Sequence, residues 1–143
     1  MKIYIGQRQI NAEENFKVIQ SPEVLEYLAE DAECETIILD TCLSKYSIGQ
    51  SVEFLKLALR KLRINGEIII NDIDFDLLCY LYSIKQNDIA AINKLLTEMG
   101  PMGSILTGES LQGAIAEMAG ESLEITSKLF SNIEFRLSYR RKS

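Results

Sequence analysis

The chain has 143 residues, of which 47% are hydrophobic and 25% charged, and its formal net charge is −6. This length suffices for one well-buried core, so the sequence predicts a single domain over residues 1–143. The acidic balance provides no overall attraction to phosphate backbones or anionic membranes, which argues against bulk nucleic-acid binding. Because no segment approaches a membrane span or an apolar leader, we expect a cytoplasmic protein without membrane contact.

The chain contains no histidine and three cysteines, Cys34, Cys42 and Cys79. This composition excludes the common zinc sites and catalytic Ser-His or Cys-His pairs, so the sequence predicts no metal site. The odd number and wide separation of the cysteines favour free thiols in a reducing compartment. Since apolar residues surround Cys42 and Cys79, we expect both side chains in the core.

The first segments of the chain alternate between strand-like and helix-like patterns. Residues 2–5 and 16–19 have the β-rich composition of short strands. Ser21 and Pro22 have the pattern of a helix start. Residues 36–39 form an apolar run without alternation, which is typical of a strand covered on both faces.

A longer helix and a second apolar strand follow. The spacing of apolar residues predicts a helix over 52–63, capped by Ser51 and ended by Asn65 and Gly66. Residues 67–70 form another strand-like run, apolar without alternation from Ile68 to Ile70. Two such strands joined by a helix form a right-handed βαβ unit, which makes the sheet parallel.

The second half of the chain predicts helices followed by a hairpin. Helices are expected over 75–84, 88–99 and 110–119, and two alternating strands over 123–130 and 133–139. We interpret the last two strands as an antiparallel hairpin added to the parallel sheet. The predicted fold class is therefore α/β, a Rossmann-like, mostly parallel doubly wound sheet with a C-terminal antiparallel hairpin.

Three segments resemble the class I S-adenosylmethionine-dependent methyltransferases: KIYIG, ETIILDTCLSKYS and FLKLALRKLRINGEIIINDID. They are similar to the first strand, the fourth strand, and the helix and fifth strand of that family. The family's turn before the fifth strand corresponds to residues 62–66, where Asn65 replaces a proline. The closing pair ITSKLFSN and IEFRLSYRR is similar to the family's antiparallel sixth and seventh strands. The resemblance implies S-adenosylmethionine as cofactor and a small molecule or a protein as methyl acceptor.

The resemblance also implies a cofactor site. In the family a glycine-rich loop follows the first strand and an acidic residue after the second strand binds the ribose. Here the loop reads Gly6, Gln7, Arg8, Gln9, and Gln20 stands at the acidic position, where it can make a hydrogen bond without charge assistance. The implied cofactor-binding residues are Ile5, Gly6, Gln7, Gln20, Asp40 and Thr41.

Two aspartates are candidates for catalysis. Ligands bind outside the carboxyl ends of the strands in open α/β sheets, and Asp40 and Asp72 each follow an apolar strand. Methyl transfer mainly requires alignment, and an aspartate at the site can orient an amine or accept a proton. We rank Asp40 first and Asp72 second. The alternative for each is a structural role as a helix cap or a loop residue.

Two functions remain open from the sequence. We predict a small divergent methyltransferase that acts on a small molecule or a protein. The alternative is a catalytically inactive methyltransferase-like binding or assembly module, and the missing glycines and the missing ribose acid argue for this alternative. LDTCLSKYSIG is also similar to the phosphoacceptor region of receiver domains, but no carboxylate follows KIYI to hold Mg²⁺. The apolar residues 77–82 are either core or a contact surface for a homo-oligomer.

Overall fold

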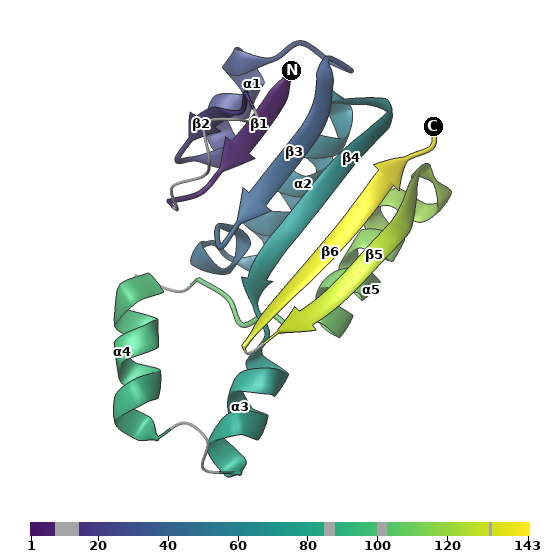
Figure 1. The fold of residues 1–143 in the computed structure, drawn as a ribbon. Helices are drawn as coiled ribbons and strands as arrows, with labels where there is room; N and C mark the ends of the chain where they lie inside the picture. The colour runs from purple at the N-terminus through teal and green to yellow at the C-terminus, as the bar shows by residue number, and fades with distance from the viewer. Residues whose placement is uncertain (8–14, 85–87, 100–102, 132) are drawn as a thin grey trace.

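The computed structural model describes residues 1–7, 15–84, 88–99, 103–131 and 133–143. In this part of the chain a sheet has the strand order β2-β1-β3-β4-β6-β5 (Figure 1). The strands are β1 (Lys2–Ile5), β2 (Lys17–Ile19), β3 (Cys34–Asp40), β4 (Leu62–Ile73), β5 (Leu123–Ser131) and β6 (Glu134–Arg141). The first four strands are parallel, and β6 runs antiparallel to both of its neighbours, β4 and β5. The predicted α/β fold class, with its C-terminal antiparallel hairpin, is confirmed.

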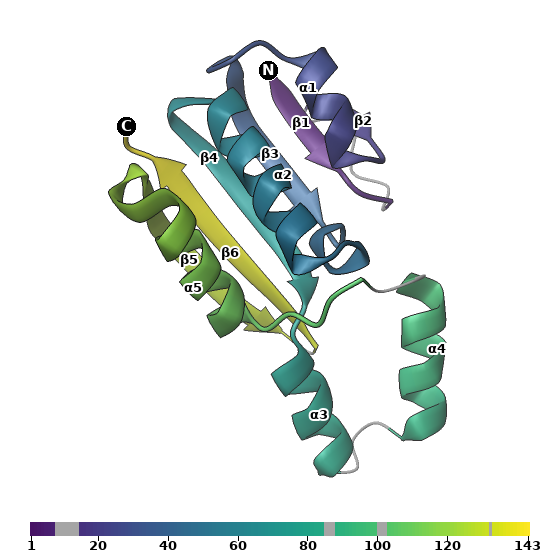
Figure 2. The same ribbon diagram turned by 180° about the vertical axis from the view of Figure 1, so that it is seen from behind.

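Three helices pack on one face of this sheet, as Figure 1 and Figure 2 show from opposite sides. They are α1 (Leu25–Leu28), α2 (Ile48–Lys61) and α5 (Gly108–Ala119). Two further helices, α3 (Phe75–Ser83) and α4 (Ile89–Met99), project beyond the end of β4. Short 3-10 helices, η2 (Pro22–Val24), η3 (Leu43–Lys45) and η4 (Gly120–Ser122), complete the connections. No helix among the described residues is long and apolar enough to cross a membrane.

The core lies between the sheet and these three helices. Every second residue of the central strands points into it, which is the period of a β-strand. Its fully buried members include Ile3, Ile5, Ile37, Leu39, Ile68, Ile70, Phe135 and Leu137. The strand register places polar pairs on the opposite face, such as Glu67 beside Arg140 and Asn71 beside Arg136. Within the part of the chain that the structure describes, helices therefore cover only one face of the central strands. The apolar runs of these strands had predicted that both faces would be covered.

The start of α2 differs from the prediction. The helix begins at Ile48, and Ser47 caps it: the Ser47 side chain accepts a hydrogen bond from the Gln50 N–H, and the Gln50 side chain accepts one from the Ser47 N–H. This reciprocal pair satisfies two backbone donors that a single serine at 51 could not. Ser51 instead lies buried in the first turn, where its hydroxyl donates to the Leu43 carbonyl at 2.9 Å.

The end of α2 also differs. The helix stops at Lys61, and the chain enters β4 at once, so Asn65 and Gly66 lie within this strand rather than ending the helix. Asn65 has a φ of 65°. Asparagine tolerates this left-handed conformation better than most residues. Asn65 can therefore occupy this irregular position near the start of β4.

The prediction that Cys79 lies in the core is wrong. Cys34 and Cys42 are buried, but Cys79 is exposed. In α3 only Leu78 is buried, whereas Tyr80 and Tyr82 are 59% and 48% exposed. The apolar residues 77–82 point to different sides of a helix that touches the domain along one side, so apolar neighbours in the sequence do not imply burial here.

Arg141 closes the C-terminal end of α2, and its replacement provides a test of this contact. Its guanidinium donates to the carbonyl oxygens of Leu59, at 2.9 Å, and of Leu62. Hydrogen bonds to charged groups contribute about 1.5–3 kcal/mol, so we expect Arg141→Met to lower the free energy of unfolding by about that amount. The exposed neighbour Arg140 is the control, since Arg140→Met should change it by at most about 0.5 kcal/mol. Urea denaturation measures both variants, and equal losses would contradict this role of Arg141.

Candidate functional site

The carboxyl ends of β2, β1, β3 and β4 lie side by side at one edge of the sheet. Two backbone hydrogen bonds continue the ladders past the strands: the Gly6 N–H donates to the Ile19 carbonyl at 3.1 Å, and the Thr41 N–H donates to the Asn71 carbonyl at 2.8 Å. This is the edge at which open α/β sheets bind ligands. The residues that meet here are Ile5, Gly6, Gln7, Gln20, Asp40 and Thr41.

Gly6 packs tightly against the end of β3. A Cβ atom added at Gly6 would lie 2.8 Å from the Asp40 carbonyl oxygen and 3.0 Å from the Tyr4 hydroxyl. Only a residue without a side chain fits between these atoms. Ile5 and Gly6 are buried, whereas Gln7, which follows Gly6, and Gln20, which follows β2, are exposed. Arg8 and Gln9, the remaining residues of the predicted loop, lie outside the described residues.

Asp40 is held by hydroxyl groups of the protein itself. The Tyr4 hydroxyl donates to its Oδ2 atom, and the Thr41 hydroxyl donates to its Oδ1 atom at 3.2 Å. The Asp40 side chain is only 4% exposed. Its carboxylate therefore connects β1 with β3 below the surface of the edge. The sequence does not indicate this role of Tyr4, because Tyr4 and Asp40 are 36 residues apart and meet only when β1 and β3 pair.

Thr41 has a strained backbone. Its φ is 52°, in the left-handed region that β-branched residues rarely adopt. Such a conformation costs about 1–3 kcal/mol and is found mainly at ligand-binding and catalytic sites. Thr41 is half-buried and directly follows Asp40, the buried last residue of β3. The strain makes this turn a candidate for a backbone shape that a ligand requires.

Asp72 is fully buried at the end of β4. Its Oδ2 atom accepts a hydrogen bond from the Ser44 N–H at 3.1 Å, and its Oδ1 atom accepts one from the Ile73 N–H at 2.8 Å. Burial raises the pKa of the Asp72 carboxyl, while the hydrogen bonds from Ser44 and Ile73 act in the opposite direction. The carboxylate thus joins η3 to β4.

The Cys42 thiol lies close to the carboxylates of both Asp40 and Asp72. Burial, with a further contribution from the two aspartates, raises the pKa of Cys42 to about 12. The thiol therefore stays protonated at neutral pH, which rules it out as a thiolate nucleophile. Cys42 lies in the core, as the sequence predicts.

The segment after α4 returns across this end of the sheet. The N–H groups of Gly103 and Ser104 both donate to the Ser44 carbonyl, at 2.7 and 3.0 Å, and the Leu106 carbonyl accepts from the Phe75 N–H at 2.9 Å. These bonds fix η3 and the start of α3 to each other. Within the described ranges, no group of three or more His, Cys, Asp or Glu side chains is arranged to hold a metal ion.

No protein-family model and no curated protein matches the sequence. The fold, however, is similar to solved methyltransferase structures. An O-methyltransferase family protein from Burkholderia thailandensis is 13% identical with a TM-score of 0.57, and the match covers 90% of this chain and 36% of that one. An S-adenosylmethionine-dependent methyltransferase from Archaeoglobus fulgidus is 13% identical with a TM-score of 0.57, and the match covers 90% of this chain and 69% of that one.

A third structure was solved with ligands. The 1,6-didemethyltoxoflavin-N1-methyltransferase from Burkholderia thailandensis, with bound 1,6-didemethyltoxoflavin and S-adenosylhomocysteine, is 11% identical with a TM-score of 0.58. The match covers 92% of this chain and 53% of that one, so the present chain spans between about a third and a half of the two Burkholderia proteins. The predicted resemblance to S-adenosylmethionine-dependent methyltransferases is confirmed at the level of the fold.

Proposed function

We propose that this chain binds S-adenosylmethionine at the edge formed by β2, β1 and β3, and transfers its methyl group to a small molecule or a protein. The observation that carries the proposal is the close approach of Gly6 to the Asp40 backbone, beside the strained Thr41. A glycine with this packing and a residue with this φ concentrate structural constraint at the strand ends where ligands of such sheets bind. The S-adenosylhomocysteine bound by a protein of similar fold supports the choice of ligand.

The polar groups at this edge suit such a ligand. Gln7 and Gln20 are exposed, and their carboxamides can donate and accept hydrogen bonds with ribose hydroxyls and with the amino-acid part of the ligand. The half-buried Thr41 lies between them and β4. S-adenosylmethionine supplies an electrophilic methyl group, and the chain would supply alignment rather than acid–base chemistry.

The two aspartates favour a second candidate, a catalytically inactive binding or assembly module. Asp40 and Asp72 are 4% and 0% exposed, and both accept hydrogen bonds from the protein's own groups. A general base must reach the proton that it removes, and the burial of both carboxylates argues against that role. In the inactive module the two aspartates hold the strand ends in place. In the methyltransferase they have the same positioning role, and the acceptor must already be nucleophilic.

Isothermal titration with S-adenosylmethionine and S-adenosylhomocysteine tests the binding site. We expect saturable binding at micromolar concentrations, weakened at least about tenfold, or 1.4 kcal/mol, in the double variant Gln7→Ala, Gln20→Ala. Both side chains are exposed, so the variant should remain folded. Glu117→Ala, on the exposed side of α5, is the matched control and should bind like the unmodified protein. Absence of binding at millimolar ligand would sink the proposal.

Transfer is tested separately from binding. The protein is incubated with S-adenosylmethionine and a panel of small-molecule and protein acceptors, and formation of S-adenosylhomocysteine is measured. Formation that depends on the acceptor and is lost in the double variant supports the methyltransferase. Binding without any product supports the inactive module.

A further inference from the structure

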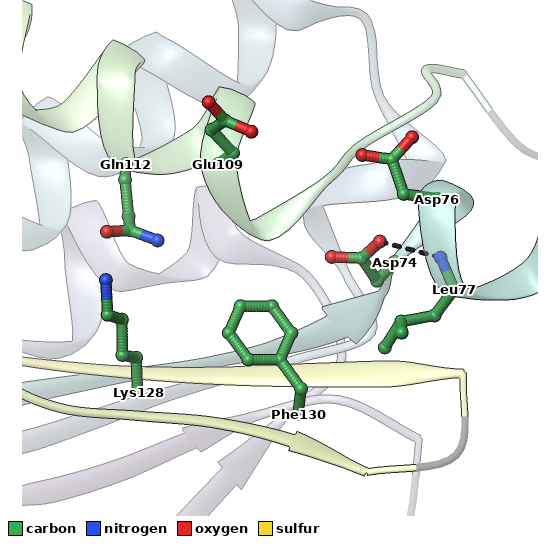
Figure 3. A pocket seen from close by; sticks show the side chains of 7 residues that line it. All are labelled: Asp74, Asp76, Leu77, Glu109, Gln112, Lys128 and Phe130. Carbon is green, nitrogen blue, oxygen red and sulfur yellow. Dashed lines mark hydrogen bonds between the residues drawn. The ribbon is translucent and has the colours of Figure 1, made fainter. Parts of the chain in front are cut away.

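A pocket lies just beyond the carboxyl end of β4, on the helix-covered face. It has a volume of about 440 Å³ and lies between the first turns of α3 and α5 and the end of β5 (Figure 3). None of the residues proposed to bind S-adenosylmethionine lines it. The lining residues are Asp74, Asp76, Leu77, Glu109, Gln112, Lys128 and Phe130.

One wall of this pocket is firmly built. Asp74 is 3% exposed and accepts two hydrogen bonds, from the Leu77 N–H at 3.1 Å and from the Gly108 N–H at 2.8 Å. These bonds cap α3 and fix its first turn to that of α5. The Phe130 ring packs on Gly108 so closely that a Cβ atom there would lie 2.7 Å from a ring carbon. The position of the aromatic ring is therefore set by the fold.

A β-bulge aims Lys128 into the pocket. Ile125 pairs with Tyr139, and the register of β5 then shifts before Ser127, so that Lys128 pairs with Leu137. Tyr139 and Leu137 both belong to the core on the helix-covered face. Strict alternation from Ile125 would have turned Lys128 to the other face of the sheet.

Charges of both signs line the pocket without neutralising each other. The side chains of Asp76, Glu109 and Lys128 are exposed, and within the described part of the chain they form no ion pair with one another. In Figure 3 the carboxylates of Asp76 and Glu109 lie above the Phe130 ring and the Lys128 side chain lies to its left. Phe130 as a whole is 50% exposed. The pocket thus offers separate partners for a cation, an anion and an apolar group.

We propose that this pocket binds a small zwitterion, a free α-amino acid or a dipeptide. Its ammonium group would face Asp76 and Glu109, its carboxylate Lys128, and its apolar side chain the Phe130 ring. Ammonium groups are also attracted to aromatic faces, which adds to the effect of the carboxylates. The volume falls within the range of about 300–1,000 Å³ that is usual for small-molecule sites. The Gln112 carboxamide can hydrogen-bond either end of the ligand.

Binding of L-phenylalanine and glycyl-phenylalanine, followed by NMR chemical shifts, tests this proposal. We expect saturable shifts with at least one of them. N-acetyl-phenylalanine amide lacks both charges and phenethylamine lacks the carboxylate, so each should bind at least about tenfold more weakly. A neutral analogue that binds as tightly as the zwitterions would overturn the assignment of the charges.

Variants of the protein locate the binding. Lys128→Met and Glu109→Gln should each weaken it at least about fivefold, whereas Lys94→Met, on the exposed surface of α4, should not change it. Because Lys128 and Glu109 are exposed, these variants should remain folded. No saturation by either zwitterion up to its solubility limit, or binding that both pocket variants leave unchanged, would overturn the proposal. Titrations without S-adenosylmethionine keep this outcome independent of the proposed function.

Discussion

Asp72→Ala is expected to lower the free energy of unfolding by several kcal/mol. The substitution leaves the Ser44 N–H and the Ile73 N–H buried without their acceptor, at a cost of about 1–3 kcal/mol for each donor. It would also free η3 from the end of β4. The midpoint of urea denaturation measures the loss. Asp76→Ala is the control, because Asp76 is exposed on α3 and its removal should cost at most about 0.5 kcal/mol. A loss in Asp72→Ala no larger than in this control would show that the two N–H groups find other partners.

The pH dependence of stability tests the same carboxyl group. Burial raises the pKa of Asp72 above its ordinary value, so the folded chain keeps this proton to a higher pH than the unfolded chain. The contribution of Asp72 to stability is therefore full below the unfolded pKa and is lost as the pH rises through the folded pKa. Asp72→Asn does not titrate. The unmodified protein should thus lose stability relative to Asp72→Asn as the pH rises above the ordinary pKa of an aspartate.

The elements of the fold could be predicted because each has a strong local signal. The apolar runs of β3 and β4 and the alternation in β6 are visible in the sequence without reference to distant residues. The start of α2 also had a local signal, the serine and glutamine three residues apart at Ser47 and Gln50. Ser51 is also a possible capping residue by its type alone. The glutamine three residues after Ser47 completes a capping box, and this pair distinguishes Ser47 from Ser51 as the cap.

The contacts within the sites could not be predicted because they depend on strand register and on bulges. Tyr4 reaches Asp40 only when β1 and β3 pair in this register. Lys128 enters the zwitterion pocket only because β5 contains a bulge, for which Thr126 provides no distinctive sequence signal. The sequence places Asp40 and Asp72 at the strand ends, but it does not show that the fold buries both of them. Their roles at the site stay predictions.

Gly6→Ala is expected to disturb the proposed S-adenosylmethionine site at its base. The new Cβ atom would lie 2.8 Å from the Asp40 carbonyl oxygen and 3.1 Å from the Asp40 Cβ atom, so β1 and β3 must separate. Overpacking of this kind costs about 1–3 kcal/mol, and the contacted atoms belong to the backbone and Cβ, which cannot rotate away. Urea denaturation should show this loss, and titration should show that S-adenosylmethionine binding is lost with it.

Gly113→Ala makes the same chemical change but is expected to raise the stability of the protein rather than lower it. Gly113 lies inside α5, and a Cβ atom there would meet no atom within 4 Å. Alanine in a helix interior is favoured over glycine by about 0.5–1 kcal/mol, so this variant should be more stable and should bind the ligand normally. Since both variants add one methyl group, a difference between them must come from the contact of Gly6 with Asp40. If Gly6→Ala matched the unmodified protein in stability and binding, the close packing of Gly6 against Asp40 would have no role in holding the ligand.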